Sequence, residues 1–159
     1  MKKYIFIVIF VLSLFSFNYV QAAQNFNATI LSYGVKLGYQ FGKEGGFVYG
    51  LEVSVTKYTK NGFGGLGGVI DIDFCKDKKM IHFGFEHSLL WVGYDIGPTF
   101  YFKDNKLFYG GTVNIFTGYL IYPFYGYSYF PAEQISIHQI GTYLKYFKLI
   151  DGNLPAFGN

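Results

Sequence analysis

The segment 31–41 alternates large apolar side chains with small or polar ones at every position. Its odd positions are Leu31, Tyr33, Val35, Leu37, Tyr39 and Phe41, and its even positions are Ser32, Gly34, Lys36, Gly38 and Gln40. Successive side chains of a β-strand point to opposite faces, so this period of two predicts an extended strand. The strand would have two chemically different faces, one large and apolar and the other small and polar.

The same alternation recurs along the chain and is interrupted by short polar or glycine-containing segments. It predicts eight strands, over 30–41, 47–58, 66–75, 80–90, 94–102, 107–117, 120–129 and 134–147. Segments such as 42–45 and 103–106 are typical of tight turns between antiparallel neighbours. We therefore expect an all-β protein in which each strand pairs with the next.

Two joints between the expected strands have no polar turn. Near Trp91 and Val92 the apolar residues change from odd to even positions, and we expect a very tight turn around Gly93 there. The sixth and seventh strands meet near Gly118. Pro123 falls within the seventh strand, and proline cannot donate a hydrogen bond to a β-ladder. A bulge is therefore expected at Pro123.

The first 22 residues have the features of an export signal. Lys2 and Lys3 precede an apolar stretch over 4–17, and Val20-Gln21-Ala22 supplies the small residues that a signal peptidase reads. We expect cleavage after Ala22. The alternative is an uncleaved anchor helix, but the apolar stretch is shorter than the roughly 20 residues that a membrane-spanning helix needs. The barrel would then occupy 23–147, and 148–159 would form a short tail.

The composition favours a barrel that is embedded in lipid. The chain is 23% aromatic and only 14% charged, and no segment after the signal has the continuous apolar run of a membrane helix. The small face carries many glycines and few charges, which makes it a poor surface for water and a suitable lining for a narrow barrel. We expect an eight-stranded antiparallel up-and-down transmembrane β-barrel, because only a helix or a closed sheet satisfies its backbone within hydrocarbon. A soluble lipid-binding barrel, with its large residues turned inward, is the alternative.

Charge and cysteine content exclude two other classes of protein. All 13 basic residues are lysines, against 10 acidic residues, and two of the lysines lie in the signal. The mature chain is close to neutral and has no concentrated basic face, so nucleic acid is not an expected partner. Cys75 is the only cysteine, so no intrachain disulfide holds this fold together.

Ionisable residues share the face that we expect to line the interior. They are Lys36, Glu52, Asp71, Asp73, His82, Glu86 and Asp95, and His138 is a further candidate. Buried charges need partners, and Lys36 and Glu52 lie on adjacent strands and are the expected pair. An eight-stranded barrel is just wide enough for its own side chains, so the lumen is expected to be filled. A small cation-preferring channel is the alternative.

The chain resembles the small eight-stranded outer-membrane barrels of the OmpA/OmpX type in its strand pattern. The final strand carries a motif similar to the signal that barrel-assembly machinery recognises, with Gln139, Gly141, Leu144 and Tyr146 at the matching places. The resemblance implies a Gram-negative outer-membrane location, outer-membrane lipid and the assembly machinery as partners, and a monomeric state. The segment 148–159 departs from it, since the strand ends the protein in many relatives.

No catalytic, metal or cofactor site is expected. Some barrels that this chain resembles modify lipid acyl chains, which takes a serine activated by a histidine. Within Glu86-His87-Ser88, His87 points away from Ser88 because neighbouring strand residues face opposite sides, whereas Ser136 and His138 share a face. The three histidines lack metal-ligand spacing. A lipid-modifying enzyme remains the alternative to a non-enzymatic protein with a structural or interaction role.

Overall fold

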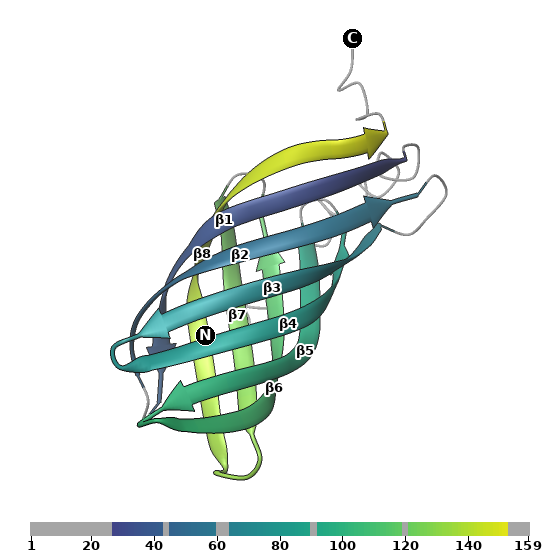
Figure 1. The fold of residues 1–159 in the computed structure, drawn as a ribbon. Coiled ribbons are helices and arrows are strands. Elements are labelled where there is room, and N and C mark those ends of the chain that lie inside the picture. The colour runs from purple at the N-terminus through teal and green to yellow at the C-terminus, as the bar shows by residue number, and fades with distance from the viewer. Residues whose placement is uncertain (1–26, 43–44, 60–63, 90–91, 119–120, 153–159) are drawn as a thin grey trace, which may run out of the picture.

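The chain folds into a closed barrel of eight antiparallel strands in up-and-down order (Figure 1). The computed structural model describes residues 27–42, 45–59, 64–89, 92–118 and 121–152. The strands are β1 (Ala28–Phe41), β2 (Gly46–Tyr58), β3 (Gly65–Cys75), β4 (Lys78–Ser88), β5 (Val92–Lys103), β6 (Lys106–Thr117), β7 (Ile121–Phe130) and β8 (Ile135–Gly152). Each strand pairs with the next, and β8 pairs with β1, so the sheet has no free edge.

The strands are strongly tilted around the barrel. One row of paired residues starts at position 28 of β1, passes once around and returns to β1 at position 38, ten residues further along. Its members are Ala28, Tyr58, Gly65, Ser88, Gly93, Phe116, Phe124, Gly141 and Gly38. A closed barrel with a stagger of this kind has strands that lie roughly 35–45° from its axis. Figure 1 shows the strands running obliquely around the barrel.

The predicted strands are present, and the differences lie at their ends and at Pro123. β8 continues to Gly152, so residues 148–152 extend the last strand and do not begin a tail. The expected bulge at Pro123 is wrong, because the pairing of β7 with β8 runs through Pro123 without a shift. Pro123 pairs with Thr142 of β8 but with no residue of β6, because the pairing of β6 with β7 ends at Phe124. The N–H that proline lacks is therefore not needed by the β6–β7 ladder. A register shift occurs instead between Thr29 and Ile30, where β1 meets β8.

The two unusual joints separate strands as predicted, but the turn expected around Gly93 is misplaced, because Gly93 lies within β5 and pairs with Ser88 and Phe116. Between β4 and β5 the amide of Leu89 donates to the carbonyl of Val92 at 2.8 Å, which links the two strands just before Gly93. Gly118 follows β6 with φ of 144°, a conformation that favours glycine. The expected signal peptide over 1–22 and residues 153–159 lie outside the described residues. Among the described residues, no helix is long and apolar enough to cross a membrane.

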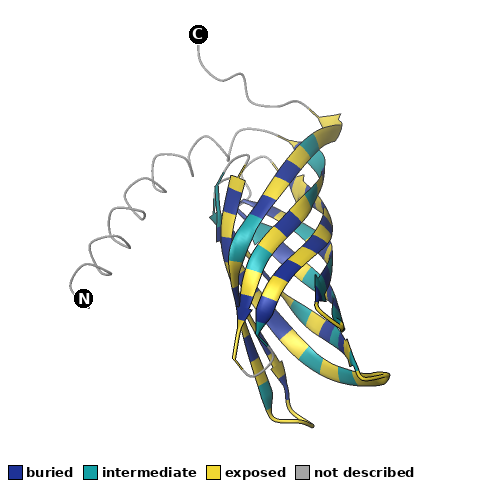
Figure 2. Ribbon diagram, turned by 90° about the vertical axis from the view of Figure 1, so that its left-hand side faces the viewer, coloured by how far each residue is buried: buried dark blue, intermediate teal, exposed yellow. Residues whose placement is uncertain are grey.

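Buried and exposed residues alternate along the strands, which appears as regular stripes in Figure 2. The small and polar residues point into the barrel and the large apolar ones point out, as the alternation in 31–41 predicts. Tyr39 is 51% exposed on the outside, for example, whereas Lys36 is 1% exposed within. The large apolar face is therefore the outer surface of the barrel.

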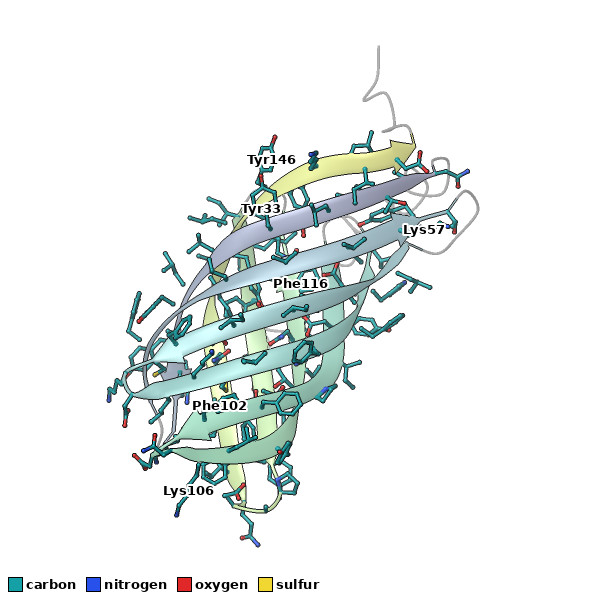
Figure 3. The ribbon with its side chains drawn as sticks, viewed as in Figure 1. Tyr33, Lys57, Phe102, Lys106, Phe116 and Tyr146 are labelled. Atoms are coloured by element: carbon teal, nitrogen blue, oxygen red, sulfur yellow. The ribbon has the colours of Figure 1, made fainter. Side chains whose placement is uncertain are left out.

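In the described part of the chain, two larger apolar clusters lie inside the barrel, besides a small one of Ala28 and Tyr58. The first, which we name the apolar layer, consists of Met80, Tyr101, Phe130 and Ile137 and lies close to the end where β1–β2, β3–β4, β5–β6 and β7–β8 turn. We name this end the turn end. The second consists of Phe116, Tyr122, Phe124 and Tyr143. Figure 3 shows Phe116 inside the barrel, behind its front strands.

Candidate functional site

The buried polar lumen brings together all seven ionisable residues that the alternation predicts to lie in the interior. Glu52, Asp71, Asp73, Glu86 and Asp95 are buried, and so are Lys36 and His82. A second lysine, Lys145, is buried with them. Five carboxylates thus face two lysines and one histidine within the barrel.

Lys36 joins two carboxylates of β3. Its Nζ lies 2.9 Å from Asp73 Oδ2 and 3.2 Å from Asp71 Oδ2. Gln139 Nε2 donates to Asp73 Oδ2 at 3.2 Å, and the Tyr143 hydroxyl donates to Asp71 Oδ2 at 3.1 Å. Strands β1, β3 and β8 are thereby linked across the lumen. The bonds are charge-assisted and lie out of water, where such contacts are strong.

The expected pair of Lys36 with Glu52 is wrong. Glu52 Oε2 lies 2.6 Å from Nζ of Lys145, which is not among the predicted inner residues. Position 145 continues the inward series of Gln139, Gly141 and Tyr143 along β8, so the alternation itself could have identified it. Alternation within a strand predicts that a side chain faces the lumen, but it does not predict which side chain across the lumen is its partner.

Glycine explains why each lysine pairs with a strand beyond its neighbour. Gly50 pairs with Lys36 on one side and with Asp73 on the other. In the same way, Gly34 pairs with Lys145 and with Glu52. Because the intervening residue has no side chain, each lysine can extend across one strand to the carboxylate on the next. For this reason, Lys36 does not pair with Glu52 of the adjacent strand, as the sequence had suggested.

A second network surrounds His82 and Asp95. His82 Nε2 lies 2.7 Å from Asp95 Oδ1, and its Nδ1 lies 3.0 Å from the Thr99 hydroxyl. Asn114 Nδ2 donates to Asp95 Oδ1 at 2.9 Å, and a chain of hydroxyls continues from Thr99 to Thr112 at 2.6 Å. These contacts tie β4, β5 and β6 together within the barrel.

Aromatic rings complete the surroundings of both lysines. Lys36 Nζ lies 4.8 Å from the ring centroid of Phe124, and Lys145 Nζ lies 4.8 Å from that of Phe116. Tyr143 stands between the two lysines, at 5.3 Å from Lys36 and 4.8 Å from Lys145. Cation–π contacts of this kind stabilise buried ammonium groups. The lysines are therefore held by carboxylates on one side and by aromatic faces on the other.

Several buried carboxylate oxygens have no hydrogen-bond donor among the described residues. They are Glu52 Oε1, Asp71 Oδ1, Asp73 Oδ1 and Glu86 Oε2. Glu86 still accepts a hydrogen bond at its other oxygen, from Thr56 at 3.0 Å. No group of three or more acidic, histidine or cysteine side chains in the described part of the chain is arranged to hold a metal ion. The lumen is thus acidic, and several of its carboxylates are only partly hydrogen-bonded within the described part of the chain.

His138 lies on the outside of the barrel and does not join the lumen network. Its Nδ1 lies 2.7 Å from the Tyr125 hydroxyl, and the neighbouring Ser136 hydroxyl lies 3.3 Å from that of Tyr127. Both residues are exposed and each pairs with a tyrosine. Among the described residues no carboxylate hydrogen-bonds to His138. The arrangement lacks the serine–histidine–carboxylate relay of a hydrolase.

The residues of the expected assembly signal are divided between the two faces. Gln139 and Gly141 point inward, while Leu144 and Tyr146 are exposed on the outer surface. Tyr146 packs beside Tyr33 of β1 with ring centroids 5.3 Å apart, and both are seen on the outside in Figure 3. Cys75 is a buried free thiol at the end of β3.

Fold and interior together define an eight-stranded closed antiparallel β-barrel with buried charged side chains in its interior. Comparison with protein-family models, with curated proteins and with solved structures found no match.

Replacement of Gly50 tests the bridging arrangement. A Cβ at this position would clash with the backbone carbonyl oxygen of Ile72 and would lie 2.6 Å from Asp73 Oδ1, so Gly50→Ala must displace the backbone of β3 as well as the carboxylate that binds Lys36. We expect a loss of about 1–3 kcal/mol in the free energy of unfolding, measured by urea titration of the refolded protein. Gly68→Ala is the matched control, since the nearest atom to its Cβ would be 3.8 Å away. Equal effects of the two substitutions would contradict the bridging role.

Proposed function

We propose that this protein is an integral β-barrel of the bacterial outer membrane, non-enzymatic, with a filled polar lumen and a structural or interaction role. The observation that carries the proposal is the outer surface. Its middle band is mainly aliphatic on six strands, with the exposed residues Val35, Leu37, Leu51, Val53, Ile70, Ile96, Val113, Ile115, Ile140 and Leu144. On β4 and β7 the same band holds the exposed aromatic residues Phe83, Phe85 and Tyr125. An apolar surface of this extent would be unstable in water, whereas lipid matches it.

Aromatic side chains border this band at the turn end. They lie close to the strand ends and include Tyr39, Phe41, Phe47, Tyr49, Phe102, Tyr109, Tyr127 and Tyr129. We name this set the aromatic girdle. Figure 3 shows Phe102 near this end of the barrel. Aromatic girdles mark the water interface of membrane barrels. Even the shortest strand, β7, has 10 residues, which is within the roughly 9–11 that a membrane strand needs.

The interior favours a filled barrel over a channel. The apolar layer lies between the polar lumen and the turn end, and its Tyr101, Phe130 and Ile137 are fully buried. Ions lose their hydration in such a layer and gain no partner there. The same interior disfavours a soluble lipid-binding barrel, whose ligand cavity would be apolar and not filled with paired charges.

Outer-membrane lipid and the barrel-assembly machinery are the partners that this proposal implies. The final strand β8 forms the closing seam with β1, over positions 28 to 41 of β1. Its motif residues Leu144 and Tyr146 lie exposed on the outer surface, where a recognition factor could bind them before closure. Closure leaves no sheet edge for pairing with another copy, which favours a monomer.

The primary experiment is extraction and electrophoresis of the mature protein. We expect it to remain with membranes through salt and carbonate washes, to require detergent for release, and to migrate differently on a detergent gel before and after boiling. Recovery of a soluble monomer from the periplasm without detergent would overturn the proposal. Altered lipid acyl chains on expression, lost in Ser136→Ala or His138→Ala, would instead favour the lipid-modifying alternative.

Leu51→Lys distinguishes a lipid-facing surface from a water-facing one. Leu51 is exposed near the middle of β2, and a lysine at the bilayer midplane costs about 2–4 kcal/mol. We expect that loss in the free energy of unfolding measured in vesicles. Leu66→Lys, near the start of β3, is the control and should cost about 0–1 kcal/mol. A change within about 0.5 kcal/mol at both positions, typical of a water-exposed surface, would contradict a membrane location.

A further inference from the structure

A groove lies on the outer surface of the barrel where β8, β1 and β2 are adjacent. Its volume is about 510 Å³, and its apolar lining comes from all three strands: Tyr33, Val35, Leu51, Val53, Leu144 and Tyr146. All six side chains are exposed on the outside of the barrel. Pockets that bind small molecules have volumes of roughly 300–1,000 Å³, so this groove is large enough for part of an apolar ligand.

The strand registers explain how the groove forms. Residues directly opposite each other in a sheet share a face, and one side of the groove is the row centred on Tyr33 of β1, the other the row centred on Val35. The row between them is centred on Gly34, whose partners Glu52 and Lys145 direct their side chains into the lumen. Toward the outside this middle row presents only backbone, which is the floor of the groove.

Two tyrosines border the groove on the side that faces away from the turn end. The rings of Tyr33 and Tyr146 are tilted against each other with centroids 5.3 Å apart, and Figure 3 shows both on the outside of the barrel. Tyrosines of membrane proteins are enriched at the level of the lipid headgroups. The groove therefore runs from that level into the aliphatic band.

Two lysines lie beyond the tyrosines, toward the end where β1 begins and β8 ends. Lys148 pairs with Leu31, which shares the outer face with Tyr33, and Lys57 pairs with Thr29 in the next outer row. Both lysines are exposed. Two strand spacings and two residues of rise place their Cα atoms roughly 12 Å apart, a separation at which two long side chains can both approach one phosphate.

Neither lysine is neutralised by an ion pair within the described part of the chain. Asp151 shares the row of Lys57, with Thr29 between them, and its Oδ1 accepts a hydrogen bond from the amide of Gly152 at 2.8 Å. These outer rows thus carry two positive charges and one negative charge beside an apolar groove. A glycerophospholipid has the matching arrangement, because its phosphate is joined directly to its acyl chains.

We infer that this groove binds one anionic glycerophospholipid, with an acyl chain against Val35 and Leu51 and its phosphate between Lys57 and Lys148. The inference rests on the proposed membrane location. Lipid is favoured over a soluble phosphate because the groove that adjoins the lysines is apolar and continuous with the aliphatic band. Each lysine near an anionic lipid surface contributes a factor of about five in affinity.

Native mass spectrometry of the refolded protein in a non-ionic detergent tests the role of the lysines, with dioleoylphosphatidylglycerol as the probe. We expect one lipid molecule to bind before any other, and Lys148→Gln to weaken its binding about fivefold. Lys79→Gln removes an outward-facing lysine near the turn end, where Lys79 pairs with Phe102, and is the matched control. It should weaken binding by less than about twofold.

A second pair of variants tests the groove itself. Val53→Phe places a ring in the groove and should weaken binding of the same lipid at least about fivefold. Ile96→Phe adds the same ring to the outer face of β5, away from the groove, and should leave binding within about twofold of wild type. Both positions are exposed, so all variants should keep the wild-type change in gel migration on boiling.

The outcomes separate this inference from the proposed function. Wild-type protein that binds no lipid, equal weakening by Lys148→Gln and Lys79→Gln, or unchanged binding in Val53→Phe overturns the inference alone. Displacement of the lipid by glycerol 3-phosphate, which has the phosphate without acyl chains, would assign the lysines to a soluble anion and would also overturn it. Protein that never inserts into phosphatidylglycerol vesicles overturns the proposed function, and the inference with it.

Discussion

Lys36→Met is expected to lower the free energy of unfolding by about 3–5 kcal/mol. The substitution removes the ammonium that lies 2.9 Å from Asp73 and 3.2 Å from Asp71 and leaves two carboxylates buried without it. Removing one partner of a buried ion pair is costly because the remaining charge is neither hydrated nor paired. Urea titration of the refolded protein, followed by gel migration without boiling, measures the loss.

Two further variants identify the cause of that loss. Lys57→Met removes an exposed lysine of the outer surface and should change stability by less than about 0.5 kcal/mol. Adding Asp71→Asn and Asp73→Asn to Lys36→Met removes the uncompensated charge and should recover part of the stability, since neutral replacements of buried pairs are often tolerated. A loss below about 1 kcal/mol in Lys36→Met would show that the ammonium does not hold the lumen together.

Phe130→Ala is expected to cost a similar amount, about 3–5 kcal/mol, through a different mechanism. Phe130 is fully buried in the apolar layer, with its ring centroid 5.1 Å from that of Tyr101. Truncation removes apolar contacts and leaves a cavity that the closed sheet cannot collapse to fill. Tyr129→Ala, the adjacent outward residue on β7, is the control and should cost clearly less, because that side chain is 41% exposed.

We expect the same layer to block conduction through the lumen. We expect no steady current from wild-type protein in a planar bilayer, and a cation-preferring current from Tyr101→Ala/Phe130→Ala, because five carboxylates would then line the path. Glu52→Gln or Asp73→Asn in that background should weaken the cation preference. Steady conductance of the wild type would instead favour the channel alternative.

Most of the architecture could be predicted from alternation. The alternation over 31–41 and 47–58 correctly predicted two strands and their inner and outer faces. A period of two follows directly from the geometry of an extended chain. The strand ends were less accurate, since β8 extends to Gly152 although its apolar pattern weakens after Phe147. Pairing with β1, through Thr29 and Asp151, holds that extension. Local sequence carries no such information.

The partners within the lumen could not be predicted in the same way. The alternation correctly predicted Lys36, Glu52, Asp71 and Asp73 as inner residues. The predicted pair of Lys36 with Glu52 was wrong, and Lys145 was not predicted as an inner residue. Pairing depends on the stagger of ten residues around the barrel and on glycines that leave space for a side chain to cross a strand. Both are properties of the closed sheet, so no single strand encodes them.

The sequence by itself determined which side chains face in and which face out, because that choice follows residue by residue from the pleat of a strand. Only the tertiary structure decided which charges meet, because the closing of β8 on β1 brings residues more than a hundred positions apart into one row. Lys145 and Glu52 form their ion pair across Gly34 for that reason.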